Sequence, residues 1–245
     1  MNESVLPATF VLRGGNVVDG TGRSGYAADV VVDDGVIRLA DPGAGAGAVI
    51  VDVDGLVVAP GFIDVHSHAD LEMFLGPHAS DVHECRLLQG VTTEVTGNCG
   101  FSPFPFPPHR SEEANAFLSF VFGGAARSFA NLAAYAEAVS SVLMACNVAP
   151  LVGHGTLRAA TLGYEDRPAT QAELGQMEHA LQTALEQGAF GLASGLCYTP
   201  ATFAVVAEVQ ALAARAARSG AIYATHVRNE TDGVRDAVDE ALAVA

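Results

Sequence analysis

The alternation of strand-like and helix-like segments after Pro60 is the feature that most limits the fold of this chain. Short apolar runs rich in β-branched residues recur five times, each followed by a longer segment with helical character. The expected strands lie at 62–65, 91–95, 148–152, 190–193 and 221–225. Repeated strand-then-helix units form a parallel sheet covered by helices, and units of this length favour an α/β fold of the TIM-like (β/α)8 barrel type.

Boundary signals support the helices between these strands. Thr170 and Glu173 have the spacing of a capping box, and Gly188 follows the apolar face of that helix as a stop signal. Another helix is expected to begin at Pro200, which would take its first position, and to end at Gly220.

The number of units is smaller than a complete barrel needs. A full eight-unit barrel takes about 250 residues, whereas residues 61–245 supply 185. The last segment, 232–245, has a helical pattern without a stop signal. We therefore expect a barrel truncated after about strand five, the front part of a longer protein.

The region before Pro60 has a different pattern. Short β-rich runs at 10–12, 28–32, 36–39, 49–53 and 56–58 are separated by the Asp-Gly turn signals of hairpins, at 19–20, 34–35 and 54–55. The sequence therefore predicts a small β domain at 1–59, followed by an incomplete barrel at 60–245.

Two histidines one residue apart follow the first strand of the predicted barrel. Successive side chains of a strand alternate between faces, so His66 and His68 are expected to point the same way and to bind one metal ion. Pro60-Gly61 ends the preceding structure and begins this strand afresh.

Other chemically active residues follow the later strands. Chemistry in a parallel barrel gathers where strands end, and those ends carry Cys99, His154, Tyr198 and His226. Imidazole and thiolate are the usual zinc ligands. Each residue also has a structural alternative: Cys99 as a small buried filler, Tyr198 as a core residue, and His154 as either a pocket or a core residue.

Composition excludes several classes of protein. A formal net charge of −16, with no lysine among its 12 cationic residues, argues against a nucleic-acid partner. The chain shows no secretory signal pattern and no apolar run of the ~20 residues that cross a bilayer. The four cysteines have no paired spacing. We therefore expect a cytoplasmic protein with no membrane partner.

Four passages carry a family resemblance. Residues 58–68, 90–102, 195–200 and 223–230 resemble the N-acyl-D-amino-acid deacylases, or D-aminoacylases, of the amidohydrolase superfamily. The most specific element is Gly97-Asn98-Cys99-Gly100, because most members of that superfamily bridge their metals with a carboxylated lysine, and this chain has no lysine.

The resemblance implies a metal-dependent hydrolase barrel with a small β-sandwich domain. It assigns His66 and His68 to the strand-one metal pair, Cys99 to the place of the lysine and His226 to the strand-five ligand. A further metal histidine from strand six and the general-base aspartate from strand eight are expected beyond Ala245. The fragment would then hold one tight zinc site in incomplete form, at Cys99 and His226, with the His66–His68 pair as a weaker second site, and would be inactive alone.

The implied reaction is zinc-dependent hydrolysis of an N-acyl-D-amino acid to a carboxylate and a free D-amino acid, with Tyr198 and His154 as candidate substrate-binding residues. Two alternatives remain open. One is another amidohydrolase that acts on cyclic amides or dipeptides, and the other is a non-catalytic metal-binding or scaffolding chain.

Overall fold

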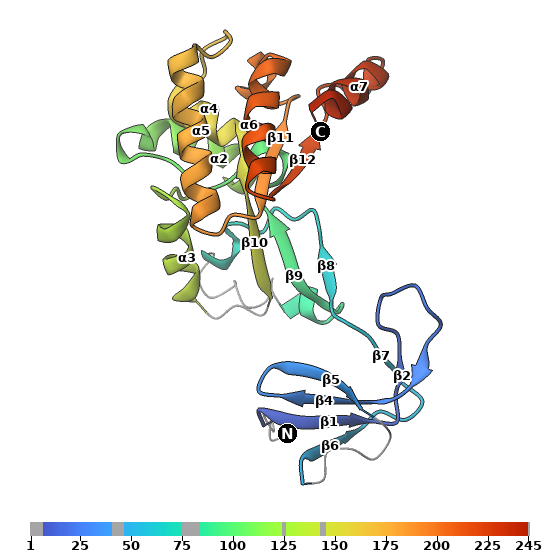
Figure 1. Cartoon of the computed structure of the whole chain (residues 1–245). Coiled ribbons are helices and arrows are strands. Elements are labelled where there is room, and N and C mark those ends of the chain that lie inside the picture. The colour runs from blue at the N-terminus through green and yellow to red at the C-terminus, as the bar shows by residue number, and fades with distance from the viewer. Residues whose placement is uncertain (1–6, 41–46, 75–83, 124–125, 143–145, 245) are drawn as a thin grey trace. The chain divides into compact units, whose positions relative to one another are not determined.

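The structure, a computed structural model, describes residues 7–40, 47–74, 84–123, 126–142 and 146–244 (Figure 1). The chain divides into two compact units, Met1–Gly61 and Phe62–Ala245. No helix in the described ranges combines the length and the apolar character needed to span a membrane.

The first unit consists of two small sheets. A four-stranded sheet has the order β5-β4-β1-β6 and a three-stranded sheet has the order β3-β2-β7. The strands are β1 (Thr9–Arg13), β2 (Asn16–Val17), β3 (Tyr26–Ala27), β4 (Asp29–Asp33), β5 (Val36–Ala40), β6 (Val49–Asp52) and β7 (Val57–Val58). These bounds confirm the five β-rich runs predicted from the sequence.

The three Asp-Gly signals have different outcomes. Asp34 and Gly35 close the antiparallel β4–β5 hairpin, and both have the positive φ, 46° and 77°, that a two-residue hairpin turn requires. Asp19-Gly20 lies in a longer loop between the paired strands β2 and β3. The hairpin predicted at Asp54-Gly55 is wrong, because β6 pairs with β1 in one sheet while β7 pairs with β2 in the other.

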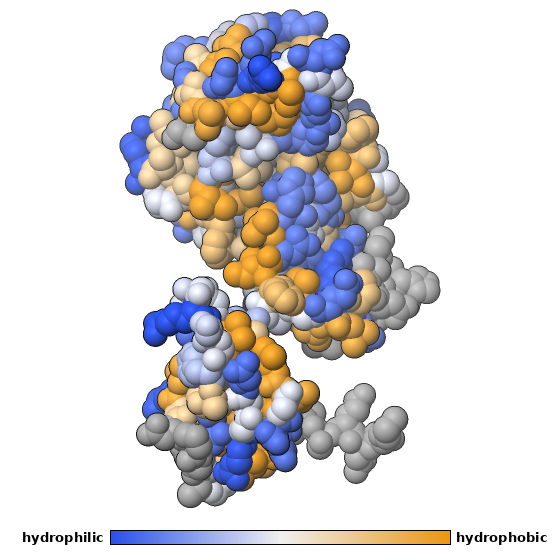
Figure 2. All heavy atoms as spheres, turned by 90° about the vertical axis from the view of Figure 1, so that its right-hand side faces the viewer, coloured by the Kyte–Doolittle hydropathy of each residue, from blue (hydrophilic) through white to orange (hydrophobic). Residues whose placement is uncertain are grey.

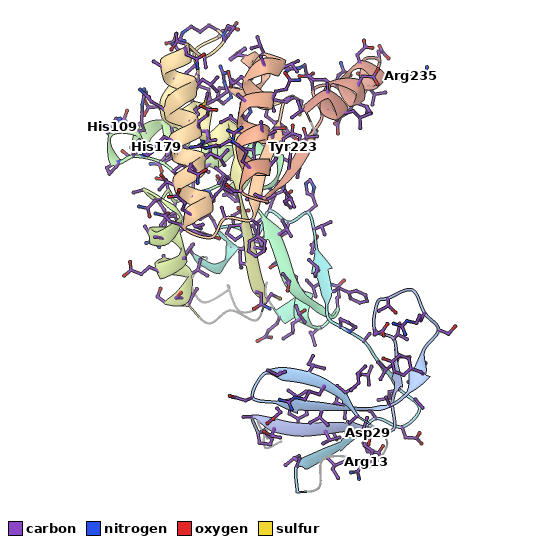
Figure 3. All side chains as sticks on the ribbon, viewed as in Figure 1. Arg13, Asp29, His109, His179, Tyr223 and Arg235 are labelled. Atoms are coloured by element: carbon purple, nitrogen blue, oxygen red, sulfur yellow. The ribbon has the colours of Figure 1, made fainter. Side chains whose placement is uncertain are left out.

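A buried carboxylate supports the first unit. Asp29 is 1% exposed and accepts a hydrogen bond from the Gly14 backbone N–H at 3.0 Å. Arg13 lies beside it, with 3.8 Å between Arg13 Nε and Asp29 Oδ2 (Figure 3). Opposite charge and a backbone donor compensate the cost of burying the carboxylate.

The second unit is built on five parallel strands in the order β12-β11-β10-β9-β8. The strands are β8 (Phe62–Asp64), β9 (Val91–Thr96), β10 (Asn147–Gly153), β11 (Gly191–Gly195) and β12 (Ile222–His226). Each strand lies beside the one that precedes it in the sequence, as in a barrel wound in one direction. All five predicted strands of this region are confirmed.

Helices cover this sheet and enclose the main core (Figure 1). They are α2 (Ser111–Phe122), α3 (Leu132–Ser140), α4 (His154–Thr161), α5 (Gln171–Glu186), α6 (Val206–Arg218) and α7 (Val234–Val244). Single 3-10 turns occur at η1 (Glu72–Phe74), η3 (Asn98–Gly100), η4 (Pro108–Arg110) and η6 (Ala201–Phe203). Met177 and Leu181 of α5 and Leu212 of α6 are wholly buried against the strands.

The two helices predicted in detail have different outcomes. Thr170 and Glu173 form the predicted capping box at the start of α5. The predicted start at Pro200 is wrong, because α6 begins at Val206 and Pro200 instead precedes the 3-10 turn η6. Ala204 is extended, with ψ of 139°, and this break separates the turn from the helix.

Apolar residues are exposed at both edge strands of the described sheet. Phe62 and Ile63 on β8 are 66% and 61% exposed, and Ile222 on β12 is 53% exposed. Figure 2 views the second unit from the side of β8, β12 and α7 and shows apolar residues at the surface among polar ones.

A buried ion pair joins two of the outer helices. Glu208 of α6 lies 2.7 Å from Arg158 Nη1 and 2.8 Å from His154 Nε2, both on α4. All three side chains are almost completely buried. Burial by itself raises the pKa of Glu208, but hydrogen bonds and charges from His154 and Arg158 outweigh it and hold the pKa below its ordinary value of 4.5.

This shift predicts a pH-dependent stability that Glu208→Gln should reduce. The folded protein holds the Glu208 proton less tightly than the unfolded chain, so the contribution is fully present above pH 4.5 and is lost as pH falls through the folded-state pKa. Urea unfolding from about pH 7 to about pH 3 should give a flatter acid limb for Glu208→Gln than for the wild type. Glu137→Gln, at an exposed position of α3, should keep the wild-type profile. Parallel acid limbs for the wild type and Glu208→Gln would contradict this account.

Candidate metal centre

The two histidines of the His-x-His motif lie just after β8. The strand ends at Asp64, so the motif itself is in the following loop, whereas the sequence placed it at the end of the strand. Ser67 N–H donates to Val95 O at 3.0 Å and continues the pairing with β9. The His66 and His68 rings lie side by side, with centroids 5.5 Å apart and an interplanar angle of 73°.

Cys99 lies in a tight turn after β9. It is the central residue of η3 and has a left-handed backbone, with φ of 54° and ψ of 22°, which is uncommon for a residue other than glycine. The residue is 8% exposed. Surrounding structure must therefore hold this strained turn in place.

Close backbone approach brings the Cys99 turn onto the ends of the neighbouring strands. A Cβ atom at Gly195, the last residue of β11, would lie 2.0 Å from Cys99 O. A Cβ atom at Gly153, the last residue of β10, would lie 2.3 Å from Gly100 O. The absence of side chains at these two positions allows the turn to lie against the sheet.

The turn places the thiol between imidazoles from opposite edges of the described sheet. Cys99 Sγ lies 3.3 Å from His66 Nε2 and 3.5 Å from His226 Nδ1. One ligand atom each from His66, His68 and Cys99 fall within 4.8 Å of one another. Residues that are 33 and 127 positions from Cys99 therefore meet at the carboxyl ends of the strands.

Burial sets the protonation of the cluster. Desolvation, followed by the nearby Cys197 and Glu230, raises the pKa of Cys99 to about 11. Desolvation, followed by the nearby His66 and His226, lowers the pKa of His68. The thiol is therefore protonated and His68 neutral near pH 7, and a cation that binds here must displace the thiol proton.

The donor set fits zinc. Sulfur and imidazole nitrogen are the ligands that zinc prefers, and His68 Nδ1 is buried with no hydrogen-bond partner in the described part of the chain. The cluster of His66, His68 and Cys99 could hold a metal ion. His226 contacts the same thiol from the side of β12.

Two side chains lie close to the His226 ring. The Tyr198 ring packs edge-on against it, with centroids 4.9 Å apart and Tyr198 Oη 3.4 Å from His226 Nδ1. Glu230 Oε1 lies 3.1 Å from His226 Nε2, although the Glu230 side chain is 66% exposed. Arg228 takes no part in this contact, because it binds Glu240 of α7 at 2.7 Å.

An aromatic cavity of about 410 Å³ lies next to Tyr198. Phe117 and Phe120 of α2, together with Phe101 and Tyr164, form its aromatic walls with Tyr198. The Phe101 and Tyr198 rings lie 5.3 Å apart, so Tyr198 borders both the cavity and His226. The lining residues that the structure describes include no charged side chain.

His154 lies at its predicted strand end but faces another partner. Its side chain is wholly buried and contacts Glu208 of α6. This contact gives it a structural role, and a role in substrate binding stays a prediction. His109 and His179 lie on the helical side of the second unit (Figure 3).

The sequence interpretation missed a layer of polar residues behind the cluster. Ser67 and Glu94 are buried and hydrogen-bonded to each other, and Arg86 contacts Glu94. The available signal was the acidic residue in the run Val91–Thr96, because a buried carboxylate in a strand needs a partner.

Comparison with known proteins agrees with this geometry. The family model described as Amidohydrolase family matches residues 49–244. The chain is 40% identical over 237 residues to an N-acyl-D-glutamate deacylase of Alcaligenes xylosoxydans xylosoxydans, covering 96% of this chain and 47% of that protein. It is 36% identical to the D-aminoacylase of the same organism, covering 97% of this chain and 48% of the relative.

Solved structures give the same result. The N-acyl-D-glutamate deacylase of Bordetella bronchiseptica, complexed with zinc and a phosphonate inhibitor, matches with a TM-score of 0.85 and 41% identity over 96% of this chain and 48% of that one. A D-aminoacylase matches with a TM-score of 0.85 and 38% identity over 97% of this chain and 49% of that one.

The chain therefore belongs to the amidohydrolase family, in its D-aminoacylase branch. It spans about half the length of the curated relatives it matches. Its parallel sheet is a five-strand half-barrel of the amidohydrolase fold, which confirms the fold class predicted from the strand–helix alternation.

The close approach at Gly195 gives a testable prediction. Gly195→Ala should push the Cys99 backbone away and lower the free energy of unfolding by about 1–3 kcal/mol, because the added methyl group meets a carbonyl oxygen. Gly175→Ala, in α5 with no atom within 4 Å of its added Cβ, should instead stabilise the chain by about 0.5–1 kcal/mol. Urea denaturation measures both, and a neutral Gly195→Ala variant would refute the close-approach argument.

Proposed function

We propose that this chain forms the metal-holding half of a zinc-dependent hydrolase that cleaves the amide bond of N-acyl-D-amino acids. The products are a carboxylate and a free D-amino acid. The observation that carries the proposal is the contact of one buried thiol with two imidazoles, one from the loop after β8 and one from the end of β12. Relatives of the D-aminoacylase branch support the choice of reaction.

The four cluster residues have assigned roles. Cys99 and His226 form the tighter zinc site, and His66 and His68 provide the weaker one. A bound zinc ion would supply Lewis-acid polarisation of the amide carbonyl and would acidify a water molecule. Tyr198 and Glu230 hold the His226 ring in its orientation. We predict that the general base, which takes the proton from the water molecule, is an aspartate beyond Ala245.

The aromatic cavity receives the apolar part of the substrate. Tyr198 lines the cavity and packs against His226, so a group seated there is one side chain away from the metal cluster. Burial of apolar surface stabilises an aliphatic or aromatic group there, whereas a carboxylate would lose hydration without gaining a cation from the lining.

Zinc binding by the chain tests the metal assignment. In the full-length protein, Cys99→Ala should abolish high-affinity zinc binding, because among the described residues the Cys99 sulfur contacts both His66 and His226. Competition with a chromophoric chelator measures the affinity. Cys146→Ala is the matched control: Cys146 is equally buried, but its thiol donates to Val91 O at 3.2 Å at the opposite end of the strands. Wild-type affinity in Cys99→Ala would overturn the assignment.

Turnover tests the reaction. The full-length protein that carries this chain, supplied with zinc, should release D-amino acids from N-acetyl-D-amino acids and should leave the L-enantiomers intact. Residues 1–245 alone should bind zinc without turnover. Hydrolysis of cyclic amides or dipeptides alone would favour another amidohydrolase activity. A zinc-loaded full-length protein without hydrolase activity would favour a non-catalytic scaffolding chain.

The cavity gives a separate prediction for Phe120, which is 71% exposed at its rim. In the full-length protein, Phe120→Ala should raise KM for N-acetyl-D-phenylalanine by about tenfold, since truncating a contacting aromatic ring removes 1–2 kcal/mol of apolar contact. Phe120→Leu should retain most of the affinity. Steady-state kinetics measure the two KM values. An unchanged KM in Phe120→Ala would show that the substrate does not occupy this cavity.

A further inference from the structure

Ser67 lies between the two histidines of the cluster and is held at every polar group. Its N–H donates to Val95 O at 3.0 Å, and its carbonyl oxygen accepts from Asn98 Nδ2 at 3.4 Å. Its hydroxyl donates to Glu94 Oε1 at 2.9 Å and accepts from the Ala69 N–H at 3.1 Å. The residue is 6% exposed, so water does not compete for these bonds.

The acceptor of the Ser67 hydroxyl is itself anchored. Glu94 is completely buried on β9, and Arg86 Nε lies 2.8 Å from the same Oε1 atom that Ser67 contacts. Arg86 also binds Glu72 of η1. A hydrogen bond to an ionised acceptor is about twice as strong as a neutral one, so the carboxylate fixes the Ser67 rotamer firmly.

The hydrogen bond from Asn98 connects Ser67 to the turn that carries the Cys99 thiol. Asn98 is 1% exposed and precedes Cys99 directly in the turn η3. Its amide nitrogen bridges two carbonyl oxygens, Val95 O at 2.9 Å and Ser67 O at 3.4 Å. The loop that carries the histidine pair and the turn that carries the thiol are therefore joined through one side chain.

We propose that Ser67, held by Glu94 and Asn98, is a positioning residue that sets the distance between the His66–His68 pair and Cys99. Neither the Ser67 hydroxyl nor the Glu94 carboxylate contacts a cluster residue directly; both act through the backbone between the histidines. The inference rests on the metal site of the proposed function and adds residues that orient it.

The energetic argument follows from burial. Removing the hydroxyl leaves the Ala69 N–H without its acceptor and the Glu94 carboxylate without one of its donors. An unsatisfied buried group costs about 1–3 kcal/mol, and the loop relieves this cost by moving. Movement of the loop changes the approach of His66 to the thiol, which is only 3.3 Å at present.

The test uses the full-length protein that carries this chain, with zinc and with cobalt(II). Ser67→Ala should bind zinc about 10- to 100-fold more weakly, the usual effect of losing a residue that orients metal ligands. The thiolate-to-cobalt charge-transfer band should shift or lose intensity. Ser67→Thr, which keeps the hydroxyl, should restore both properties, and Glu94→Gln should change them in the same direction as Ser67→Ala.

Glu208→Gln separates positioning from general loss of stability. Like Glu94, Glu208 is a buried carboxylate beside an arginine, with Arg158 Nη1 2.7 Å away. Glu208 lies between α4 and α6, however, and not beside the metal cluster. Glu208→Gln should lower the free energy of unfolding while the zinc affinity and the cobalt spectrum stay as in the wild type. If Ser67→Ala keeps wild-type affinity and spectrum, the positioning role is refuted while the metal site stands. If the wild-type chain binds no zinc, the proposed function fails and the inference fails with it.

Discussion

The close packing of the Cys99 turn against the ends of β10 and β11 is the constraint on which the rest of the site depends. Gly153 and Gly195 leave room for the turn, and Cys99 adopts a left-handed backbone to fit it. The cost of that conformation is met by surrounding packing and hydrogen bonds. This turn lets the Cys99 thiol reach two imidazoles at opposite edges of the half-barrel, His66 after β8 and His226 at the end of β12.

This arrangement gives a chain without lysine a thiol that reaches two imidazoles. A thiolate is a compact, soft ligand that two imidazoles can approach, and its high pKa without a cation means that metal binding and proton release occur together. The aromatic cavity adjoins Tyr198, which packs against His226, while Ser67, Glu94 and Asn98 form a buried polar network that joins the loop of the histidine pair to the turn of the thiol.

Much of the fold could be predicted because it depends on local patterns. The parallel strands, the capping box at Thr170 and the hairpin at Asp34-Gly35 each follow from side-chain periodicity or turn chemistry within a few residues. Two predictions were wrong because the surrounding structure overrode a local signal. Pro200 had the signal of a helix start, yet the chain first makes a separate 3-10 turn, and Asp54-Gly55 had the signal of a hairpin, yet its flanking strands pair in different sheets.

The sequence by itself determined the inventory of the site: a thiol and four imidazoles at predicted strand ends, with no lysine to replace the thiol. Only the tertiary structure decided which of these groups meet. It brought Cys99 to His66 and His226 and directed the His154 ring to Glu208, although all follow strands in the sequence. The physical reason is that strand order and the direction of each side chain are set by pairing and packing across the whole sheet, which no local pattern encodes.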